Sequence, residues 1–244
     1  MDSKIKQLER ILQNSKSIVF FGGAGVSTES GIPDFRSQSG LYNQKSDIPP
    51  EVILSHSFFF DHPDKFYEYY FSKMVDLSIK PNSAHYQLAK WEKIGKVKAV
   101  ITQNIDGLHQ LAGSKTVYEL HGTIHKNYCV NCNKAYSIHD IIKYKDMKQI
   151  PRCSCGGIIK PQVVLYNEQL DNATITNAIK AISTCDTLII AGTSLIVYPA
   201  AGLVDYFNGK NLILINKDDV AKNVTPAIVI KDFVGKTLSK INLH

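Results

Sequence analysis

Four of the five cysteines in this 244-residue chain stand in two close pairs. Two residues separate Cys129 from Cys132, one separates Cys153 from Cys155, and twenty lie between the pairs. Four thiolates suit tetrahedral zinc, and a full set of sulfur ligands leaves no position for a catalytic water. We therefore predict a structural zinc site formed by these four cysteines, with unliganded buried cysteines as the alternative.

A glycine-rich segment at residues 22–28 follows a short apolar run and is a candidate dinucleotide loop. Glycine lets the backbone approach a pyrophosphate, and free amide groups at a helix start favour its charge. The match to the dinucleotide pattern is partial, because Thr28 replaces the third glycine and no acidic residue ends a strand about 20 residues further on. The segment favours a bound dinucleotide over hydride transfer, and a plain tight turn is the alternative.

Two further polar segments are expected at the ends of strands. Gln103, Asn104 and Asp106 follow the apolar run 97–102, and His121 follows the shorter run 117–120. Amide and carboxylate groups can bind the hydroxyl and amide groups of a nucleotide, and a histidine titrates near neutral pH, as a general base must. A polar turn without function is the alternative for residues 104–107.

Runs rich in β-branched residues alternate with helical patterns, which predicts an α/β fold with a parallel, doubly wound sheet. Strands are expected at 17–21, 97–102, 187–191 and 211–215, with weaker candidates at 117–120 and 227–230. Such sheets bind ligands at the carboxyl ends of their strands. The glycine loop, Asn104 and His121 are all expected there.

Two stretches interrupt this alternation and divide the chain into three predicted parts. Residues 1–40, 82–125 and 161–244 form a Rossmann-like domain. Residues 41–81, rich in Phe, Tyr and Pro, form a helical insert whose aromatic side chains mostly pack in a core. Residues 126–160 carry the paired cysteines and form the small zinc-binding module.

Composition narrows the partners of the chain. Lysine and arginine total 28 against 22 acidic residues, but they are scattered, and there is a single Trp, so we expect no nucleic-acid partner. No apolar run reaches the roughly 20 residues that span a bilayer, and the first residues do not resemble a signal peptide. We expect a monomeric, cytoplasmic protein without a membrane partner.

The motifs, taken in order, resemble those of the sirtuins, which are NAD-dependent protein deacylases. The resemblance spans residues 5–238. It rests on GAGVSTESGIPDFR at 23–36, TQNIDGLH at 102–109, ELHG at 119–122, the paired cysteines, KP at 160–161, VV at 163–164, GTSL at 192–195 and VYPA at 197–200.

The resemblance implies a site for NAD drawn from distant parts of the chain. Its residues would line the phosphates and the nicotinamide ribose, hold nicotinamide in a pocket, or contact the adenosine half. They are Gly23, Ala24, Gly25, Thr28, Asp34, Phe35, Arg36, Gln103, Asn104, Ile105, Asp106, His121, Gly192, Thr193, Ser194, Asn216 and Asp232.

The resemblance also implies a reaction, in which NAD is a co-substrate and zinc is structural. The acyl oxygen of an acyl-lysine attacks C1′ of the nicotinamide ribose, and nicotinamide leaves. His121 then takes a proton from a ribose hydroxyl, and that sugar oxygen attacks the acyl carbon. Water completes the reaction, so that the acyl group ends on ADP-ribose and lysine is released. Asn104 would assist by binding ribose or water.

The acylated protein or peptide is expected to bind as an extended strand between two edges of the chain. Gln162, Tyr166 and Asn167 stand where sirtuins usually have Asp, Phe and Gly, and a side chain at 167 can alter the peptide's approach. The insert lacks the Tyr and Arg, three residues apart, that relatives use for succinyl groups, so acetyl-lysine is the expected substrate. The implied peptide contacts are Val163, Val164, Leu165, Tyr166 and Val197.

Three other functions remain open on the sequence. A protein ADP-ribosyltransferase would use the same cleft with another acceptor. A non-catalytic NAD sensor would keep the glycines without needing His121, Asn104 and Asp106. A dehydrogenase would need the missing ribose-binding acid. The products separate these functions: acylated ADP-ribose, ADP-ribosylated protein, none, or reduced nicotinamide.

Overall fold

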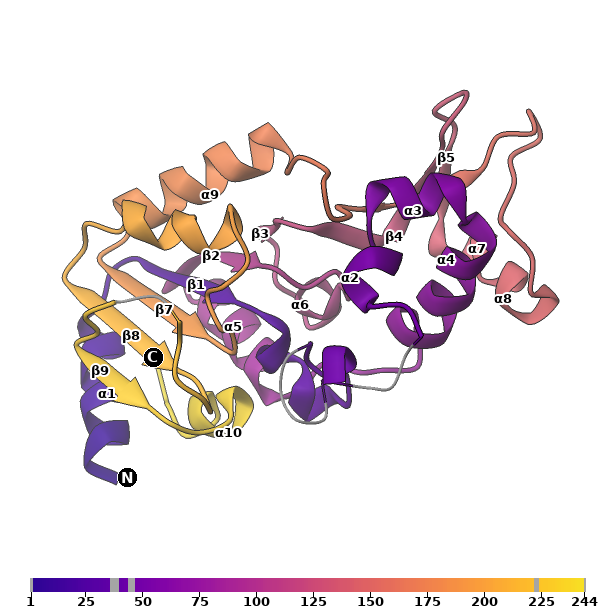
Figure 1. Ribbon diagram of the computed structural model, residues 1–244. Helices are drawn as coiled ribbons and strands as arrows, with labels where there is room; N and C mark the ends of the chain where they lie inside the picture. Colours follow the sequence, from indigo (N-terminus) through magenta and orange to yellow (C-terminus); the bar gives the residue numbers. More distant parts are fainter. Residues whose placement is uncertain (1, 36–39, 44–46, 222–223, 244) are drawn as a thin grey trace.

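The computed structural model describes residues 2–35, 40–43, 47–221 and 224–243, and two sheets organise them (Figure 1). The larger sheet contains β1 (Ile18–Gly22), β2 (Val97–Thr102), β3 (Val117–Glu119), β7 (Thr187–Ala191), β8 (Asn211–Ile215) and β9 (Ile228–Ile230). The smaller sheet contains β4 (Gly122–Cys129), β5 (Ala135–Ser137) and β6 (Ile159–Val163).

Helices cover both sheets within these residues. They are α1 (Asp2–Asn14), α2 (Pro50–Ile53), α3 (His56–Asp61), α4 (Pro63–Tyr69), α5 (Ser83–Lys93), α6 (Leu108–Leu111), α7 (Ile138–Ile141), α8 (Lys143–Met147), α9 (Asn172–Thr184) and α10 (Val234–Leu238). Short 3₁₀ segments occur at Ala24–Val26, Thr28–Ser30, Leu41–Asn43 and Ala200–Tyr206, and a π-helical turn at Tyr70–Met74 follows α4. None of the described helices is long and apolar enough to cross a membrane.

The larger sheet has the strand order β3-β2-β1-β7-β8-β9, and each of these pairings is parallel. Its six strands, counted along the chain, follow the Rossmann order 3-2-1-4-5-6, which reverses direction between β1 and β7. The predicted doubly wound parallel sheet is therefore confirmed. The crevice that such sheets use for ligands lies at that reversal.

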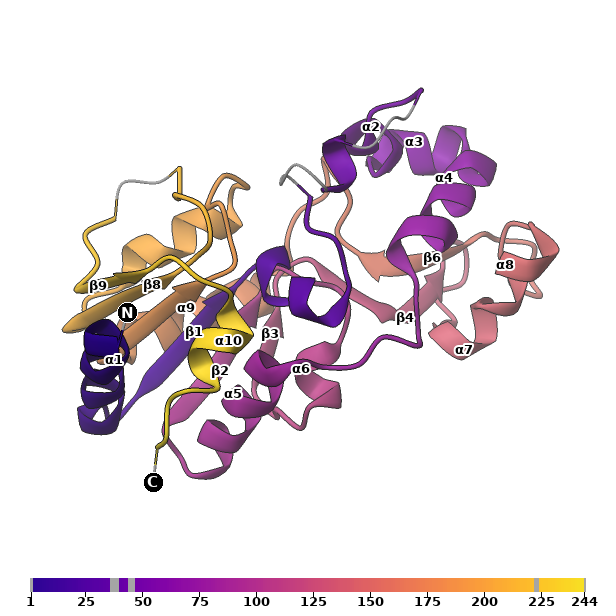
Figure 2. The same cartoon turned by 90° about the horizontal axis from the view of Figure 1, so that it is seen from below.

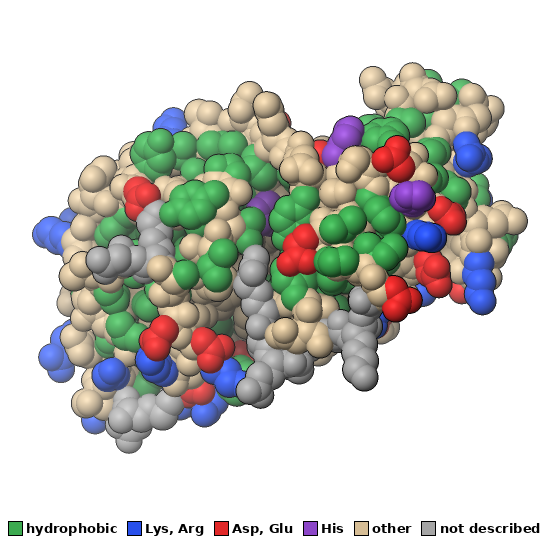
Figure 3. All heavy atoms as spheres, in the orientation of Figure 1, with side chains coloured by type: hydrophobic (Ala, Val, Ile, Leu, Met, Phe, Trp, Pro, Cys, Tyr) green, Lys and Arg blue, Asp and Glu red, His purple; other side chains and the backbone are tan. Residues whose placement is uncertain are grey.

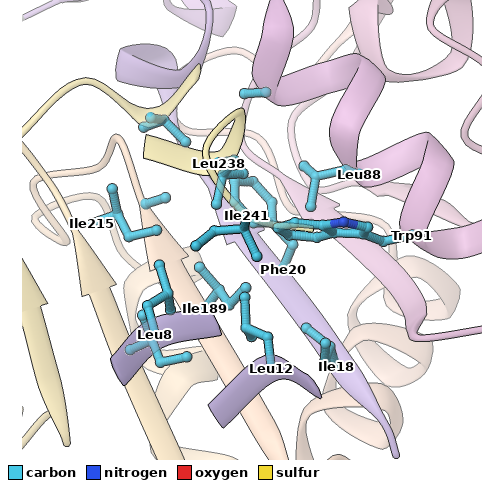
Figure 4. Packing of buried hydrophobic residues seen from close by; sticks show 14 of the residues in the cluster. Leu8, Leu12, Ile18, Phe20, Leu88, Trp91, Ile189, Ile215, Leu238 and Ile241 are labelled. Carbon is cyan, nitrogen blue, oxygen red and sulfur yellow. The ribbon is translucent and has the colours of Figure 1, made fainter. Parts of the chain in front are cut away.

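The central strands are apolar on both faces because helices cover both faces of the sheet. In β1, Ile18 and Phe20 pack in one core with residues of α1, α5 and α10 (Figure 4), whereas Val19 and Phe21 pack in another with residues of α9. Successive side chains of a strand point to opposite faces, so a five-residue run serves both cores. α1 contributes Leu8 and Leu12, which are four residues apart and therefore lie on the same face of the helix.

The insert and the small sheet share a third core, which Figure 2 shows set apart from the larger sheet. Aromatic side chains of α3, α4 and the π-helical turn pack against apolar residues of β4 and β6. The rings of Phe59 and Phe66 meet edge to face with their centroids 4.9 Å apart, and the ring of Tyr70 stacks on that of Phe66 with a centroid separation of 5.6 Å. Core packing of most of these aromatics was the sequence prediction, and it is confirmed.

Glycines allow the loops after β1 and β7 to touch. The backbone N–H of Gly25 donates to the carbonyl of Gly192 at 2.8 Å. A Cβ on Gly192, whose φ is +57°, would lie 2.5 Å from the nitrogen of Val26, and one on Gly25 would lie 2.8 Å from Cα of Gly192. Gly25 was expected to let the backbone approach a pyrophosphate. The structure shows that the loop after β7 fills the space where its Cβ would lie.

We predict that Gly192→Ala lowers the free energy of unfolding by about 1–3 kcal/mol more than Gly95→Ala does. Both glycines have a left-handed φ, which costs alanine about 1–2 kcal/mol, but a Cβ on Gly95 meets nothing within 4 Å. Urea unfolding of the two variants measures the difference. Equal losses would show that the close approach of the two loops is unimportant for stability.

Candidate functional site

The carboxyl ends of β1, β2 and β7 bring three of the predicted segments together. The backbone N–H of Gln103, after β2, donates to the carbonyl of Gly22 at the end of β1 at 2.9 Å. The Gln103 amide donates to Oγ1 of Thr193, after β7, at 3.0 Å. Gly23 donates its N–H to the carbonyl of Ala191 at 3.2 Å. The site thus lies at the reversal of strand order.

Asn104 and Asp106 are joined through a serine. Nδ2 of Asn104 donates to Oγ of Ser27 at 3.0 Å, and that hydroxyl donates to Oδ2 of Asp106 at 2.7 Å. The second carboxylate oxygen of Asp106 accepts the N–H of Leu108 at 2.9 Å. Because a carboxylate has about four acceptor positions, Asp106 can still accept a hydrogen bond from a ligand. Its carbonyl is contacted by Nε2 of His125 at 3.0 Å.

Ser27 is the residue that sequence reasoning missed in this network. It is buried at 1% exposure and lies within the glycine-rich segment 22–28. Its position between Gly25 and Thr28 was the available signal. A partner 79 positions away could not be read from that signal.

His121 lies between β3 and β4, and its ring is oriented by the backbone. Nδ1 lies 2.9 Å from the carbonyl oxygen of Gln103. A carbonyl only accepts hydrogen bonds, so Nδ1 carries the proton and Nε2 of the neutral ring holds a lone pair. Burial lowers the pKa of His121 below its usual value, against the opposing effect of the Gln103 carbonyl. The arrangement presents a neutral base at Nε2.

Backbone hydrogen bonds tie Asp34 and Phe35 to Leu41 and Tyr42. The N–H of Leu41 donates to the carbonyl of Asp34 at 2.8 Å, and the N–H of Tyr42 donates to that of Phe35 at 2.9 Å. The Phe35 and Tyr42 rings meet at 5.4 Å. Arg36, predicted beside the phosphates, lies outside the described residues.

The residues assigned to the adenosine half lie beyond β7. The backbone N–H of Ala221 donates a hydrogen bond to the carbonyl oxygen of Ser194 at 3.0 Å. The N–H of Asn216, after β8, donates to the carbonyl of Ile230 at the end of β9 at 3.1 Å. Asp232 is almost fully buried and pairs with Lys236 at 3.0 Å, so its carboxylate already has a cationic partner.

The segment predicted to bind the peptide, residues 163–166, is itself hydrogen-bonded to other parts of the chain. The N–H of Val164 donates to the carbonyl of His121, which couples this strand to the histidine. The backbone of Tyr166 is bonded on both sides, from its N–H to Leu54 and from its carbonyl to the N–H of His56, each at 2.9 Å. Asn167 has a φ of +70°, which explains why glycine is usual there, and Asn is among the few other residues that adopt this conformation readily.

The four paired cysteines form one cluster, as predicted. Their Sγ atoms all lie within 4.8 Å of one another, with Cys129 and Cys155 at 3.4 Å and Cys132 and Cys153 at 3.6 Å. A zinc ion at their centre, with zinc–sulfur bonds of about 2.3 Å, fits these separations. The tight second pair turns at Gly156, whose φ is +87°.

A cavity of about 760 Å³ opens beside the site, a volume typical of small-molecule pockets. Residues of the segments 31–33, 72–79, 106–111 and 123–126 line much of it. Among the described residues predicted to bind NAD, Asp106 alone lines this cavity.

Known proteins resemble the whole chain. A model of the Sir2 family matches residues 23–199. The chain is 58% identical over 241 residues to an NAD-dependent protein deacetylase of Clostridium acetobutylicum, with 98% of each chain covered. It is 56% identical over 245 residues to one of Clostridium perfringens, with 99% of each covered.

Solved structures of Sir2 enzymes share the fold. One, which concerns the mechanism and regulation of these enzymes, has a TM-score of 0.90 at 40% identity and covers 98% of this chain and 96% of its own. Another contains a deacetylated p53 peptide and 3′-O-acetyl ADP-ribose, with a TM-score of 0.90 at 37% identity and coverage of 97% and 96%. These matches show that the chain belongs to the Sir2 family.

Proposed function

We propose that this protein is an NAD-dependent protein lysine deacetylase that transfers the acetyl group of acetyl-lysine to ADP-ribose and releases nicotinamide. The observation that carries the proposal is the contact of His121 Nδ1 with the Gln103 carbonyl, which leaves Nε2 as a base on a ring held by the residue next to Asn104. Asn104 in turn belongs to the Asn104–Ser27–Asp106 network. Deacetylases of the same family, 53–58% identical over nearly the whole chain, support it.

The donor set suits NAD. The loops after β1, β2 and β7 meet where doubly wound sheets bind dinucleotides, and Asp106 and Asn104 offer an acceptor and an amide for nicotinamide and ribose. NAD, when bound, supplies an ADP-ribose unit that gives up nicotinamide and accepts the acetyl group. We assign its contacts as the sequence predicted, with Arg36 among them, and the peptide contacts to residues 163–166 and Val197.

The remaining steps of the proposed reaction are assigned to side chains and backbone groups of this protein. Nε2 of His121 takes the proton of a ribose hydroxyl, and the Gln103 carbonyl holds the ring and its proton on the other side. Asn104 orients ribose or water through its amide, which Ser27 fixes in place. Because Val164 is bonded to the His121 backbone, a peptide seated on residues 163–166 lies in register with the base.

The zinc site has a structural role in this proposal. Four sulfur ligands leave no position for water or substrate, and the third core packs Cys129 and Cys153 with the aromatic insert. We retain the division into a Rossmann-like domain (1–40, 82–125, 161–244), an insert (41–81) and a zinc module (126–160).

Other functions receive less support. Transfer of ADP-ribose to protein is not favoured, because the relatives are deacetylases and a related structure contains acetyl ADP-ribose.

We also propose a cytoplasmic monomer without a nucleic-acid partner. Its described cysteines are free of disulfides, its exposed large hydrophobic side chains are scattered over several helices and loops, and Lys and Arg are spread around the rim of the face in Figure 3.

We predict that His121→Ala lowers kcat/KM for an acetyl-lysine peptide by about 10²- to 10⁴-fold, because the general base is removed. Deacetylated peptide is measured by mass spectrometry in the presence and absence of NAD. His139→Ala, at an exposed histidine of the zinc module, is the matched control and should retain activity. Normal turnover by His121→Ala, with the wild-type melting temperature, would remove His121 from the mechanism.

The pH dependence of kcat/KM should reflect the lowered pKa of His121. Burial disfavours the protonated ring, so the active neutral form persists to a lower pH than for an exposed histidine. We expect the acid limb of kcat/KM to have its inflection below about pH 6.5, the usual value for histidine. Melting temperatures over the same pH range exclude unfolding as the cause. An inflection at about pH 7 or above contradicts the assignment.

We predict about one zinc ion per chain by elemental analysis, in keeping with the four-cysteine site. Removing it with a chelator should lower the melting temperature and, indirectly, activity, because metal binding is coupled to folding of the module. Cys132→Ser should lose zinc, whereas Cys185→Ala, which lies outside the cluster, should keep it. Full stability and activity without metal would count against a structural role.

A further inference from the structure

A pair of tyrosine hydroxyls joins Tyr42, which contacts Phe35, to the segment 163–166 that is predicted to bind the peptide. The hydroxyl groups of Tyr42 and Tyr166 are hydrogen-bonded to each other, although the residues are 124 positions apart. The contact needs a hydroxyl group on both side chains, so a Phe at either position would remove it.

Tyr42 controls the position of Phe35. Backbone hydrogen bonds of 2.8 and 2.9 Å close the loop, the second from the N–H of Tyr42 to the carbonyl of Phe35. The two rings are in contact, with centroids 5.4 Å apart and planes inclined at 60°. Phe35 is the aromatic residue assigned to the nicotinamide ribose. Any group that holds Tyr42 consequently holds the Phe35 ring as well.

Tyr166 is firmly anchored at the other end. Its backbone is bonded to Leu54 and His56 on one side, and the residue before it donates its N–H to the Glu168 carboxylate at 2.9 Å. The same carboxylate binds Nζ of Lys160 at 3.0 Å, and the side chain of that lysine is 4% exposed. Burial of a charge pair with such short contacts fixes the turn that follows the strand.

We propose that the Tyr42–Tyr166 pair couples the two substrate sites of this enzyme. The backbone of Tyr166 is already fixed within the chain, so an acetyl-peptide seated on residues 163–166 acts on the Tyr166 side chain. That side chain is bonded to Tyr42, and Tyr42 contacts the Phe35 ring assigned to NAD. The inference rests on the proposed function. Coupling between binding sites is reciprocal, so NAD strengthens peptide binding by the same factor. One neutral hydrogen bond contributes a factor of about 2 to 10.

The test is a calorimetric measurement of the Kd of an NAD analogue whose glycosidic bond cannot be cleaved. The ratio of its Kd without and with saturating acetyl-lysine peptide is the coupling factor. We expect Tyr166→Phe and Tyr42→Phe each to reduce this factor by about 2- to 10-fold, and the double variant to reduce it no further, because both remove one bond. Tyr86→Phe, at a 53% exposed tyrosine of α5, should leave it unchanged.

Three results would each overturn the proposal: a coupling factor of one in the wild-type protein, a coupling factor that is unchanged in the single variants, or additive reductions in the double variant. A merely structural role weakens the analogue equally with and without peptide and leaves the factor unchanged, so it too counts against the proposal. Failure of the deacetylase function is seen separately, as wild-type protein that releases no nicotinamide with NAD and peptide.

Discussion

β1 is hydrogen-bonded in parallel to β2 on one side and to β7 on the other, and this arrangement decides where chemistry can take place. Parallel strands deliver their carboxyl ends to one edge, so the loops after residues 22, 102 and 191 must meet there. They can meet only because Gly25 and Gly192 lack side chains at the point of contact. The proposed dinucleotide site lies where these loops meet.

Polar groups at this edge are held mostly by other parts of the chain rather than by their sequence neighbours. Ser27 connects Asn104 to Asp106, and the Gln103 carbonyl orients His121. Such contacts are stronger away from water, since the dielectric response of a protein interior is weaker. In the proposed mechanism, preorganisation of this kind lets His121 act as a base without first finding its orientation.

Much of the fold could be predicted from sequence, because runs such as residues 187–191 and 211–215 are apolar and β-branched enough to identify buried strands. The cysteine spacing identified the metal site for a similar reason: few other arrangements use four close thiols. The role of Gly25, the bridge by Ser27 and the Tyr42–Tyr166 bond could not be predicted. Each depends on a partner 77 or more positions away, and local pattern carries no information about such pairing.

The account as a whole requires that the bond between nicotinamide and ribose is broken and that the acetyl group is captured by the sugar. Mass spectrometry of all products, after incubation with NAD and an acetyl-lysine peptide, tests this directly. Equal amounts of nicotinamide, free-lysine peptide and acetyl ADP-ribose are the predicted result. Reduced nicotinamide, ADP-ribosylated peptide, or no release of nicotinamide would contradict it.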